Sequence, residues 1–523
     1  MHFMIELNGR LVNFSNTLRT NNELYILQPS ACEKNNILLK FIESGKTILT
    51  ITPCDVIVEH DCHHQLFTYN SPSSRYISSS LIEIVEKTNT KIKLDMIFFA
   101  TYIICGSHPS TRSPFEKISY LGPGSTINIR LGSISEHQWK STEPREFLDC
   151  IESYLDKNIP DKEVVGLEYS GGLESTILLH ALLKICPARL KLYHLTDSIS
   201  AAGDDRQSAI QCAERYNCEI TLFDMDQALP FDTKKSNKIM PSFPHSGLVN
   251  MAYQDFAHNL ITKQKTKLIN GSGGDSLFCS HPQKELVTEL FLKGKFISAA
   301  IALKELSRYF RLPLLRTINQ SAKSYANALN YLSDPIMFMR SEYGGDAFLN
   351  VENLSNPTYN FPDNTISLEN NDITTLGRAQ NILFNKYEML TSPISSVPGR
   401  YLYPFLSPET TAIALAIPST LLTKEKHNRH YLRQAAFNRY GNESLWNTRK
   451  GGAMGLTQKA FLANRCNIED LILNGVFVEK HIVDIDRTKK LIDGITIGAT
   501  PCPHALIHLF TANIFIKYWE AYL

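Results

Sequence analysis

The sequence predicts an α/β fold in two domains: a β-rich domain over residues 1–135 and a larger domain over residues 143–523 built on a doubly wound parallel sheet. Short apolar or alternating runs, separated by Gly, Asn, Pro and Ser, predict the first domain. A strand, a glycine turn and a helix in direct succession predict the sheet of the second domain. Helical spacing after residue 283 predicts that this domain ends in a mainly helical region.

Length and charge narrow the class of protein. A chain of 523 residues is too long for one ordinary core, and 43% hydrophobic residues can fill two or three. Lys and Arg number 53 against 52 for Asp and Glu, so the whole chain has no net field to hold nucleic acid or an anionic membrane. We therefore expect no nucleic-acid and no membrane partner, and any basic patch must be local.

Three features favour a cytoplasmic protein. The longest apolar stretch, residues 94–106, has about 13 residues and falls short of the roughly 20 that span a bilayer. The N-terminus lacks the charged and apolar regions of a secretion signal. The 11 cysteines are odd in number and form no CxxC pair, which suits reduced thiols. The segment EHDCHH contains residue types that bind metals, namely His60, Cys62, His63 and His64. Residues so close in sequence rarely bind one ion together, and we interpret the segment as a polar loop or the end of a strand.

The elements follow in order along the chain. In the first domain, strands are expected in the runs HFMIELNG, TILTIT, DVIVEHD, HQLFTYN and STINIRLG. A linker is expected near residues 133–143. A helix then follows, because Phe147, Cys150, Ile151 and Tyr154 fall on one face at helical spacing.

The next segment predicts the parallel sheet. A strand, glycine turn and helix over residues 162–184 are followed by a strand from Leu190, a helix around Ala209 to Tyr216, and a strand EITLFDMD. Strands that alternate with helices at this spacing form right-handed βαβ units. In such a sheet the ligand lies beyond the carboxyl ends of the strands.

The glycine turn SGGLES, residues 170–175, occupies the first of these strand ends. Ser170, Gly171 and Gly172 let the main chain approach an anion at a helix N-terminus, and Ser175 adds a hydroxyl. No Lys follows the glycines, and the spacing is not that of a dinucleotide-binding turn. A turn of backbone donors with an acid, Glu174, inside it favours pyrophosphate held together with Mg²⁺.

This turn resembles the SGGxDS loop of the ATP pyrophosphatase superfamily, and three further segments resemble the asparagine synthetase family. They are KLINGSGGDSLFCSH (267–281), with Asp275 at the metal-binding acid, YPFLSPE (403–409), and LRQAAFNRYGNESLWNTRKGG, with Lys450 at the position of the lysine that contacts the phosphate. The four matches are in order over about 300 residues. The resemblance implies that the second domain is an ATP-pyrophosphatase sheet that uses ATP and Mg²⁺.

The resemblance also implies the site residues. Glu174 and Asp275 would hold the metal, and together with Lys450 they would be catalytic. Residues expected to bind ATP or pyrophosphate are Ser170, Gly171, Gly172, Glu174, Ser175, Leu195, Thr196, Asn270, Gly271, Ser272 and Gly273. The family has Asp where this chain has Glu174, whose extra methylene extends the carboxylate by about 1.5 Å. Two readings stay open: Mg²⁺ bound through a shifted loop or a bridging water, or a weakened site.

The first domain resembles a degenerate glutaminase-like domain of the N-terminal-nucleophile type, because LGPGSTINI (121–129) is similar to its closing strand. A working glutaminase of this type needs a Cys directly after the initiator Met. This chain has His2. The amine is therefore expected from the substrate itself or from a second substrate, and not from glutamine.

Two glutaminase-free groups resemble this chain: β-lactam synthetases and lasso peptide cyclases. GSGGDSLF (271–278) is more similar to the cyclases, and Ser272 stands where β-lactam synthetases have a tyrosine of their base dyad. The resemblance implies adenylation of an Asp or Glu side chain of a leaderless core peptide. Its N-terminal amine would then close a macrolactam, with a leader peptidase as partner.

Other readings stay open. They are a small-molecule β-lactam or asparagine-type synthetase and a catalytically impaired peptide-binding homologue. An RNA-modifying enzyme is disfavoured by the neutral charge. Asp204 and Asp205 are interpreted as helix caps, Gly344 to Asp346 as a loop, and His194 with Thr196 as main-chain contacts to adenine.

Overall fold

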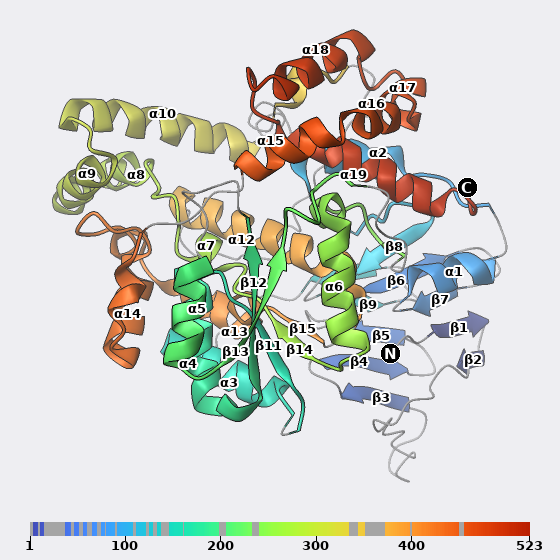
Figure 1. Cartoon of the computed structure of the whole chain (residues 1–523), viewed down its shortest axis with the longest axis horizontal. Helices are drawn as coiled ribbons and strands as arrows, with labels where there is room; N and C mark the ends of the chain where they lie inside the picture. Colours follow the sequence, from blue (N-terminus) through green and yellow to red (C-terminus); the bar gives the residue numbers. More distant parts are fainter. Residues whose placement is uncertain are drawn as a thin grey trace.

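A five-stranded parallel sheet lies at the centre of the chain, seen here in a computed structural model (Figure 1). Its strands run in the order β13 (Glu219–Asp224), β12 (Leu190–Thr196), β11 (Val165–Glu168), β14 (Lys267–Ile269) and β15 (Tyr401–Leu402). All four pairings are parallel. The chain moves outward from β11 to β13 and then returns to the other side of β11 for β14, so the strand order reverses between β11 and β14. The predicted α/β fold with a parallel sheet is confirmed.

The structure describes a defined set of residues. These are 4–8, 11–14, 37–42, 46–51, 56–59, 65–70, 75–78, 80–88, 91–107, 111–121, 125–128, 133–136, 146–160, 162–197, 206–232, 240–333, 344–350, 372–397, 400–448 and 454–523. Lys450, Asp204, Asp205, His2 and the cluster from His60 to His64 lie outside them, so the predictions that rest on these positions stay predictions.

Helices cover both faces of the parallel sheet. On one face lie α3 (Phe147–Asn158), α4 (Leu173–Ile185) and α5 (Arg206–Arg215), and on the other lies α6 (Met251–Thr262). The two-residue period of a strand explains the division, since Leu192 packs with the first group and Tyr193 with α6. The predicted apolar face of α3 is buried.

The N-terminal region contains two antiparallel sheets, which agrees with the predicted β-rich composition. One has the order β2 (Leu11–Phe14), β1 (Met4–Asn8), β7 (Arg75–Ser78), β6 (Leu66–Asn70) and β8 (Ile118–Leu121). The other has the order β10 (Ser133–Glu136), β9 (Ser125–Asn128), β5 (Val56–Glu59), β4 (Lys46–Ile51) and β3 (Ile37–Ile42). The glutaminase-like character of this region stays a prediction, as do the domain boundaries.

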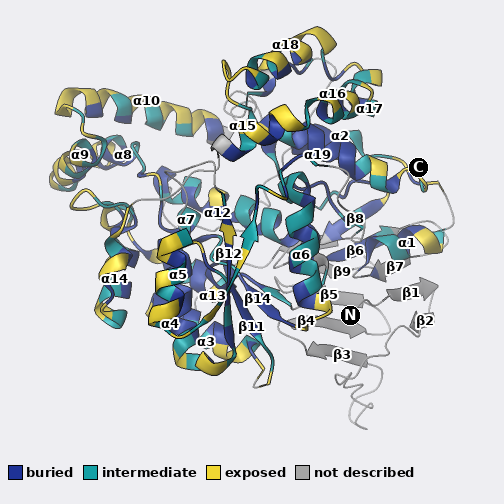
Figure 2. Cartoon of the chain, viewed as in Figure 1, coloured by how far each residue is buried: buried dark blue, intermediate teal, exposed yellow. Residues whose placement is uncertain are grey.

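The apolar stretch near residue 94 forms a core helix, α2 (Met96–Cys105), that packs on α19 (His504–Trp519). The Tyr102 hydroxyl lies 2.7 Å from Thr511 Oγ1, and His508 Nδ1 lies 3.1 Å from the Ile103 carbonyl oxygen. Figure 2 shows both helices largely in the buried colour. One hydrophobic core therefore joins residues of the two predicted domains. Among the described residues, no helix combines the length and apolar character needed to cross a bilayer.

Helices dominate after residue 283, as the spacing predicts. They are α8 (Leu286–Leu292), α9 (Phe296–Phe310), α10 (Leu314–Ser333), α12 (Ile373–Thr391), α13 (Pro408–Ala416), α14 (His430–Tyr440), α15 (Met454–Ala463), α16 (Arg465–Leu473), α17 (Val476–Glu479) and α18 (Ile485–Thr496), in addition to α19. Two short helices come earlier in the chain, α1 (Leu81–Thr88) and α7 (Gly274–Leu277). Gly344 to Asp346, predicted as a loop, instead begin a short 3-10 turn, Gly345–Ala347, which Gly344 caps.

Candidate active site

A cavity of about 680 Å³ opens at the carboxyl ends of β11, β12 and β14, where the strand order reverses. This is the position at which doubly wound sheets bind ligands. The structure brings the predicted site residues together there, since the lining includes Ser170, Gly172, Glu174, Ser175, Leu195, Thr196, Asn270, Gly271, Ser272, Gly273 and Asp275. Gly171 belongs to the same turn as its neighbours but does not line the cavity.

The first glycine turn joins β11 to α4. Gly171 has a φ of +73°, a left-handed conformation that L-residues rarely adopt, while a Cβ there would meet nothing within 4 Å. Position 171 therefore requires glycine because of its backbone angle, and not because neighbouring atoms leave no room for a side chain. Gly172 caps α4, and Ser170 Oγ lies 3.2 Å from Ser175 Oγ. The N-terminus of this 13-residue helix faces the cavity, and a helix N-terminus suits a phosphate.

The second glycine turn follows β14 and lies directly against the first. A Cβ at Gly274 would lie 2.4 Å from Cγ of Glu174, and one at Gly271 would lie 3.0 Å from its Cβ. The Glu174 side chain thus passes over glycines that leave room for it. This contact places the longer acid at position 174 beside Asp275, the first acid of α7.

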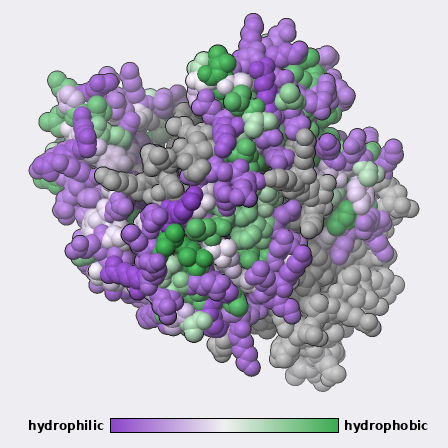
Figure 3. All heavy atoms as spheres, viewed as in Figure 1, coloured by the Kyte–Doolittle hydropathy of each residue, from purple (hydrophilic) through white to green (hydrophobic). Residues whose placement is uncertain are grey.

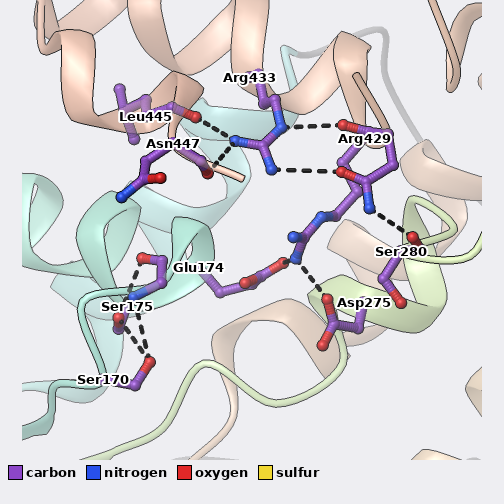
Figure 4. Close-up of polar contacts among 11 residues, drawn as sticks. Ser170, Glu174, Ser175, Asp275, Ser280, Arg429, Arg433, Leu445 and Asn447 are labelled. Carbon is purple, nitrogen blue, oxygen red and sulfur yellow. Dashed lines mark hydrogen bonds and ion pairs between the residues drawn. The ribbon is translucent and has the colours of Figure 1, made fainter. Parts of the chain in front are cut away.

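Glu174 and Asp275 meet at a single cation, the guanidinium of Arg429 (Figure 4). Arg429 Nη1 donates a hydrogen bond to Glu174 Oε1 and to Asp275 Oδ1. Arg429 is 7% exposed and stands directly before α14. Sequence reasoning missed it, because no local pattern marks an arginine whose partners lie 154 and 255 residues away.

The electrostatic environment of the acids follows from burial. Burial raises the pKa of Glu174, the charge of Arg429 lowers it and Asp275 raises it, with a net upward shift. Burial also lowers the pKa of nearby Arg433 to about 10, with a further lowering by Arg429. Arg433 donates to the carbonyl oxygens of Asn447, at 3.0 Å, and of Leu445. It thus holds the segment that leads toward Lys450.

The donor set fits a magnesium ion, since Mg²⁺ in nucleotide sites uses one or two carboxylates with phosphate oxygens and waters. Two carboxylates already converge on one cationic centre here. That centre is the Arg429 guanidinium, so both acids can face a metal only if this side chain moves. Within the described residues, no group of three or more His, Cys, Asp or Glu side chains gathers at one point.

A third acid in the cavity, Glu168, ends β11 and was also missed by sequence reasoning. It accepts hydrogen bonds from the hydroxyls of Tyr253 and Tyr401, the latter at 2.7 Å, and from the Asn270 amide. Asn270 Oδ1 in turn accepts from Ser272 N at 2.6 Å. Glu168 therefore anchors the second glycine turn. Burial raises its pKa, and the three hydrogen bonds lower it by less. An acid at the end of an otherwise apolar strand was the available signal.

The wall near the end of β12 is apolar. Leu195 is 45% exposed and lines the cavity with Phe223 and Phe256. The Thr196 carbonyl oxygen accepts from Met225 N at 3.0 Å, and His194 Nδ1 lies 2.7 Å from the Tyr169 carbonyl oxygen. The flat face of a nucleotide base has apolar side chains to pack against here, while the His194 ring and the Thr196 carbonyl oxygen are engaged within the protein.

Comparison with known proteins gives one family. The asparagine synthase family model matches residues 155–500, which is more than half of the chain. No curated protein matches the chain. Among solved structures, the U34-tRNA thiolase NcsA from Methanococcus maripaludis, solved with its 4Fe-4S cluster, is 14% identical over 34% of this chain, with a TM-score of 0.20. The match covers 60% of that protein, less than two thirds of its length.

Proposed function

Because the chain belongs to the asparagine synthase family, we propose that it is an AMP-forming ligase that activates a carboxylate with ATP and passes it to an amine. Family membership supports an ATP-dependent enzyme that forms amide or C–N bonds. The observation that carries the proposal is that Glu174 and Asp275, from two glycine turns, line the same cavity and meet at one cation, Arg429.

The chemistry needs ATP because a carboxylate and an amine do not condense at neutral pH. A substrate oxygen attacks the α-phosphorus, the bond to pyrophosphate breaks, and an acyl adenylate forms. The amine then attacks the acyl carbon, AMP leaves, and the amine loses a proton. The family also implies a magnesium ion, which would be held by Glu174 and Asp275 and would supply charge neutralisation for the departing pyrophosphate.

This chain's own groups have distinct roles in that scheme. The turn from Ser170 to Ser175 and the N-terminus of α4 bind the pyrophosphate. Glu168 and Asn270 hold the second turn in register with the first. Lys450, from the family motif, contacts the phosphate. Leu195 and Phe223 pack against the base.

The finer proposal is a macrolactam synthetase of the lasso peptide type. Its substrate would be a leaderless core peptide, in which an Asp or Glu side chain is adenylated and the N-terminal amine closes the ring, with a leader peptidase as partner. Support comes from the GSGGDSLF segment, which is more similar to the lasso peptide cyclases than to the β-lactam synthetases. Holding both reacting groups in one peptide makes ring closure unimolecular, an advantage of roughly 7 to 11 kcal/mol in good geometry.

One observation favours a second candidate, a homologue that binds peptide without turnover. Arg429 lies on the point where both acids would face a metal, so an arginine that never moves would leave the acids unable to bind one. The two candidates differ in whether pyrophosphate is released.

The test is a turnover assay with synthetic peptides that carry an N-terminal amine and an Asp or Glu some seven to nine residues later, the span that the lasso family implies. We expect AMP and pyrophosphate to form with Mg²⁺ and ATP, and the peptide to lose one water. Peptide binding without AMP would support the second candidate. AMP formed only with aspartate and ammonia would indicate an asparagine-type enzyme and overturn the peptide proposal.

A further inference from the structure

Three helices form a lobe that projects away from the parallel sheet, labelled α8, α9 and α10 in Figure 1. The lobe has a small core of its own, made of Leu286, Val287, Leu290, Ala299, Ala302 and Leu306. It nevertheless carries nine of the fifteen large hydrophobic side chains that are exposed in the described part of the chain. Figure 3 shows green spheres among purple ones over this lobe. Such a concentration marks an interaction surface.

Helix α10 has its apolar face turned outward. Thr317 and Ser321 are buried, and Ser321 Oγ accepts from Thr288 N of α8 at 3.0 Å. Leu315, by contrast, is 82% exposed, and Ile318 and Leu329 are also exposed. These three positions recur at helical spacing along the 20-residue helix. Helix α10 thus buries Thr317, Ser321 and Tyr331 and leaves these three apolar side chains in water, free for a partner.

The turn between α8 and α9 adds a second apolar element. Phe291, Leu292, Phe296 and Ile297 are all at least 60% exposed around this turn. Two aromatic and two aliphatic side chains in water within seven residues contribute nothing to the lobe's own core. A partner that covers these four side chains would remove their apolar surface from water.

The charge around these side chains has one sign. Seven basic residues of the lobe are exposed. Lys293 and Arg308 pair with Glu289 and Glu305, and the other five are Lys295, Lys304, Arg311, Arg316 and Lys323. Between residues 291 and 333 the sequence contains a single acid, Glu305, which pairs with Arg308. The near-neutral sum over the whole chain conceals this local excess. A second copy is disfavoured as occupant, because a two-fold interface would place like charges together.

We propose that the α8–α10 lobe binds the surface of a bilayer that contains anionic lipids. The exposed side chains of α10 and of the α8–α9 turn would enter the boundary between headgroups and acyl chains, while the lysines and arginines reach the lipid phosphates. Each basic residue near such a surface strengthens partitioning by about fivefold. This binding is peripheral, and it differs from the expectation of no membrane partner drawn from net charge. It does not depend on the proposed function.

The test is co-sedimentation of the full chain with vesicles. Wild type should pellet with an equal mixture of phosphatidylcholine and phosphatidylglycerol, but not with phosphatidylcholine alone, and less at high salt. Leu315→Ser with Ile318→Ser, and separately Arg316→Glu with Lys323→Glu, should each lower binding at least tenfold. Ile497→Ser, at a side chain 78% exposed on the end of α18, is the matched control and should leave binding unchanged.

Three outcomes overturn the proposal. The first is absence of pelleting with the anionic vesicles at low salt, and the second is equal pelleting of wild type and both variants. The third is a concentration-dependent dimer in light scattering that is lost in the Leu315→Ser, Ile318→Ser variant and binds no vesicles, which would make a second copy the occupant. All substitutions are at exposed positions, and thermal unfolding of each variant checks that the fold is kept.

Discussion

Glu174 and Asp275, 101 positions apart in the sequence, accept hydrogen bonds from the same nitrogen of Arg429. Two glycine turns at neighbouring strand ends produce this meeting. Glu174 and Arg429 are both buried, whereas the Asp275 side chain is 41% exposed to the cavity. With both acids ionised, the single guanidinium offsets only one of the two carboxylate charges, and it stands where a divalent cation would face both acids.

Replacing the arginine should expose its role as a counterion. In Arg429→Met, Glu174 loses its buried partner, so we expect the free energy of unfolding to fall by about 3 kcal/mol. Mg²⁺ should restore part of this loss, because both carboxylates then face an open point. Urea unfolding with and without Mg²⁺ measures both effects. An unchanged unfolding free energy in the variant would show that the ion pair does not form.

Glu168 should make stability depend on pH. Its pKa is raised by burial, so the folded state binds a proton more tightly than the unfolded state does, and the associated stability is lost as pH rises above the ordinary value of 4.5. In Glu168→Gln this loss should disappear, and the free energy of unfolding should fall less than in wild type between pH 4.5 and 7. If the free energy of unfolding changed with pH in the same way in wild type and Glu168→Gln, the raised pKa of Glu168 would be contradicted. Other buried acids contribute equally to both and cancel in the comparison.

The left-handed glycine of the first turn offers a matched pair of variants. Gly171→Ala should cost about 1 to 2 kcal/mol of stability, because Ala is strained at a φ of +73°, and it should also weaken ATP binding. Gly294→Ala is the control, since Gly294 has a φ of +71° and equally open surroundings in the turn after α8. It should lose similar stability with no change in ATP affinity, measured by calorimetry. Equal ATP affinities in the two variants would argue against a phosphate site at this turn.

The buried hydroxyl pair between α2 and α19 tests the joint core. Tyr102→Phe removes the hydrogen bond to Thr511 and should lower the free energy of unfolding by about 1 kcal/mol. Thermal unfolding should stay a single transition, because one core joins the two regions. Two separate transitions in wild type would indicate that these regions fold independently.

Local patterns predicted the parts of this protein whose causes are local. The strand, turn and helix from Val165 to Ile185 follow from apolar periodicity and two glycines, and the parallel sheet follows from the repeat of that unit. Glu174 was found because it lies in a glycine turn at a strand end, whereas Asp275 was found through the resemblance of residues 267–281 to the asparagine synthetase family. The fit of the longer acid at position 174 depends on Gly274, which belongs to the other turn, and no spacing rule conveys it.

What sequence reasoning missed depends on distant partners. Arg429 acquires its role from two acids more than 150 residues away, and Glu168 acquires its role from Tyr253 and Tyr401. The outward apolar face of α10 depends on the burial of Ser321 against α8. Periodicity shows that a helix has an apolar stripe, but which side faces the protein is decided by packing.

The central claim is that Glu174 and Asp275 share one cation that assists the departure of pyrophosphate. Binding of Mn²⁺, as a stand-in for Mg²⁺, tests it most directly when measured by electron paramagnetic resonance in the presence of ATP. We predict that Asp275→Asn lowers Mn²⁺ affinity at least tenfold, while Asp156→Asn, on the exposed side of α3, leaves it unchanged. Equal Mn²⁺ affinity in wild type and Asp275→Asn would contradict the claim.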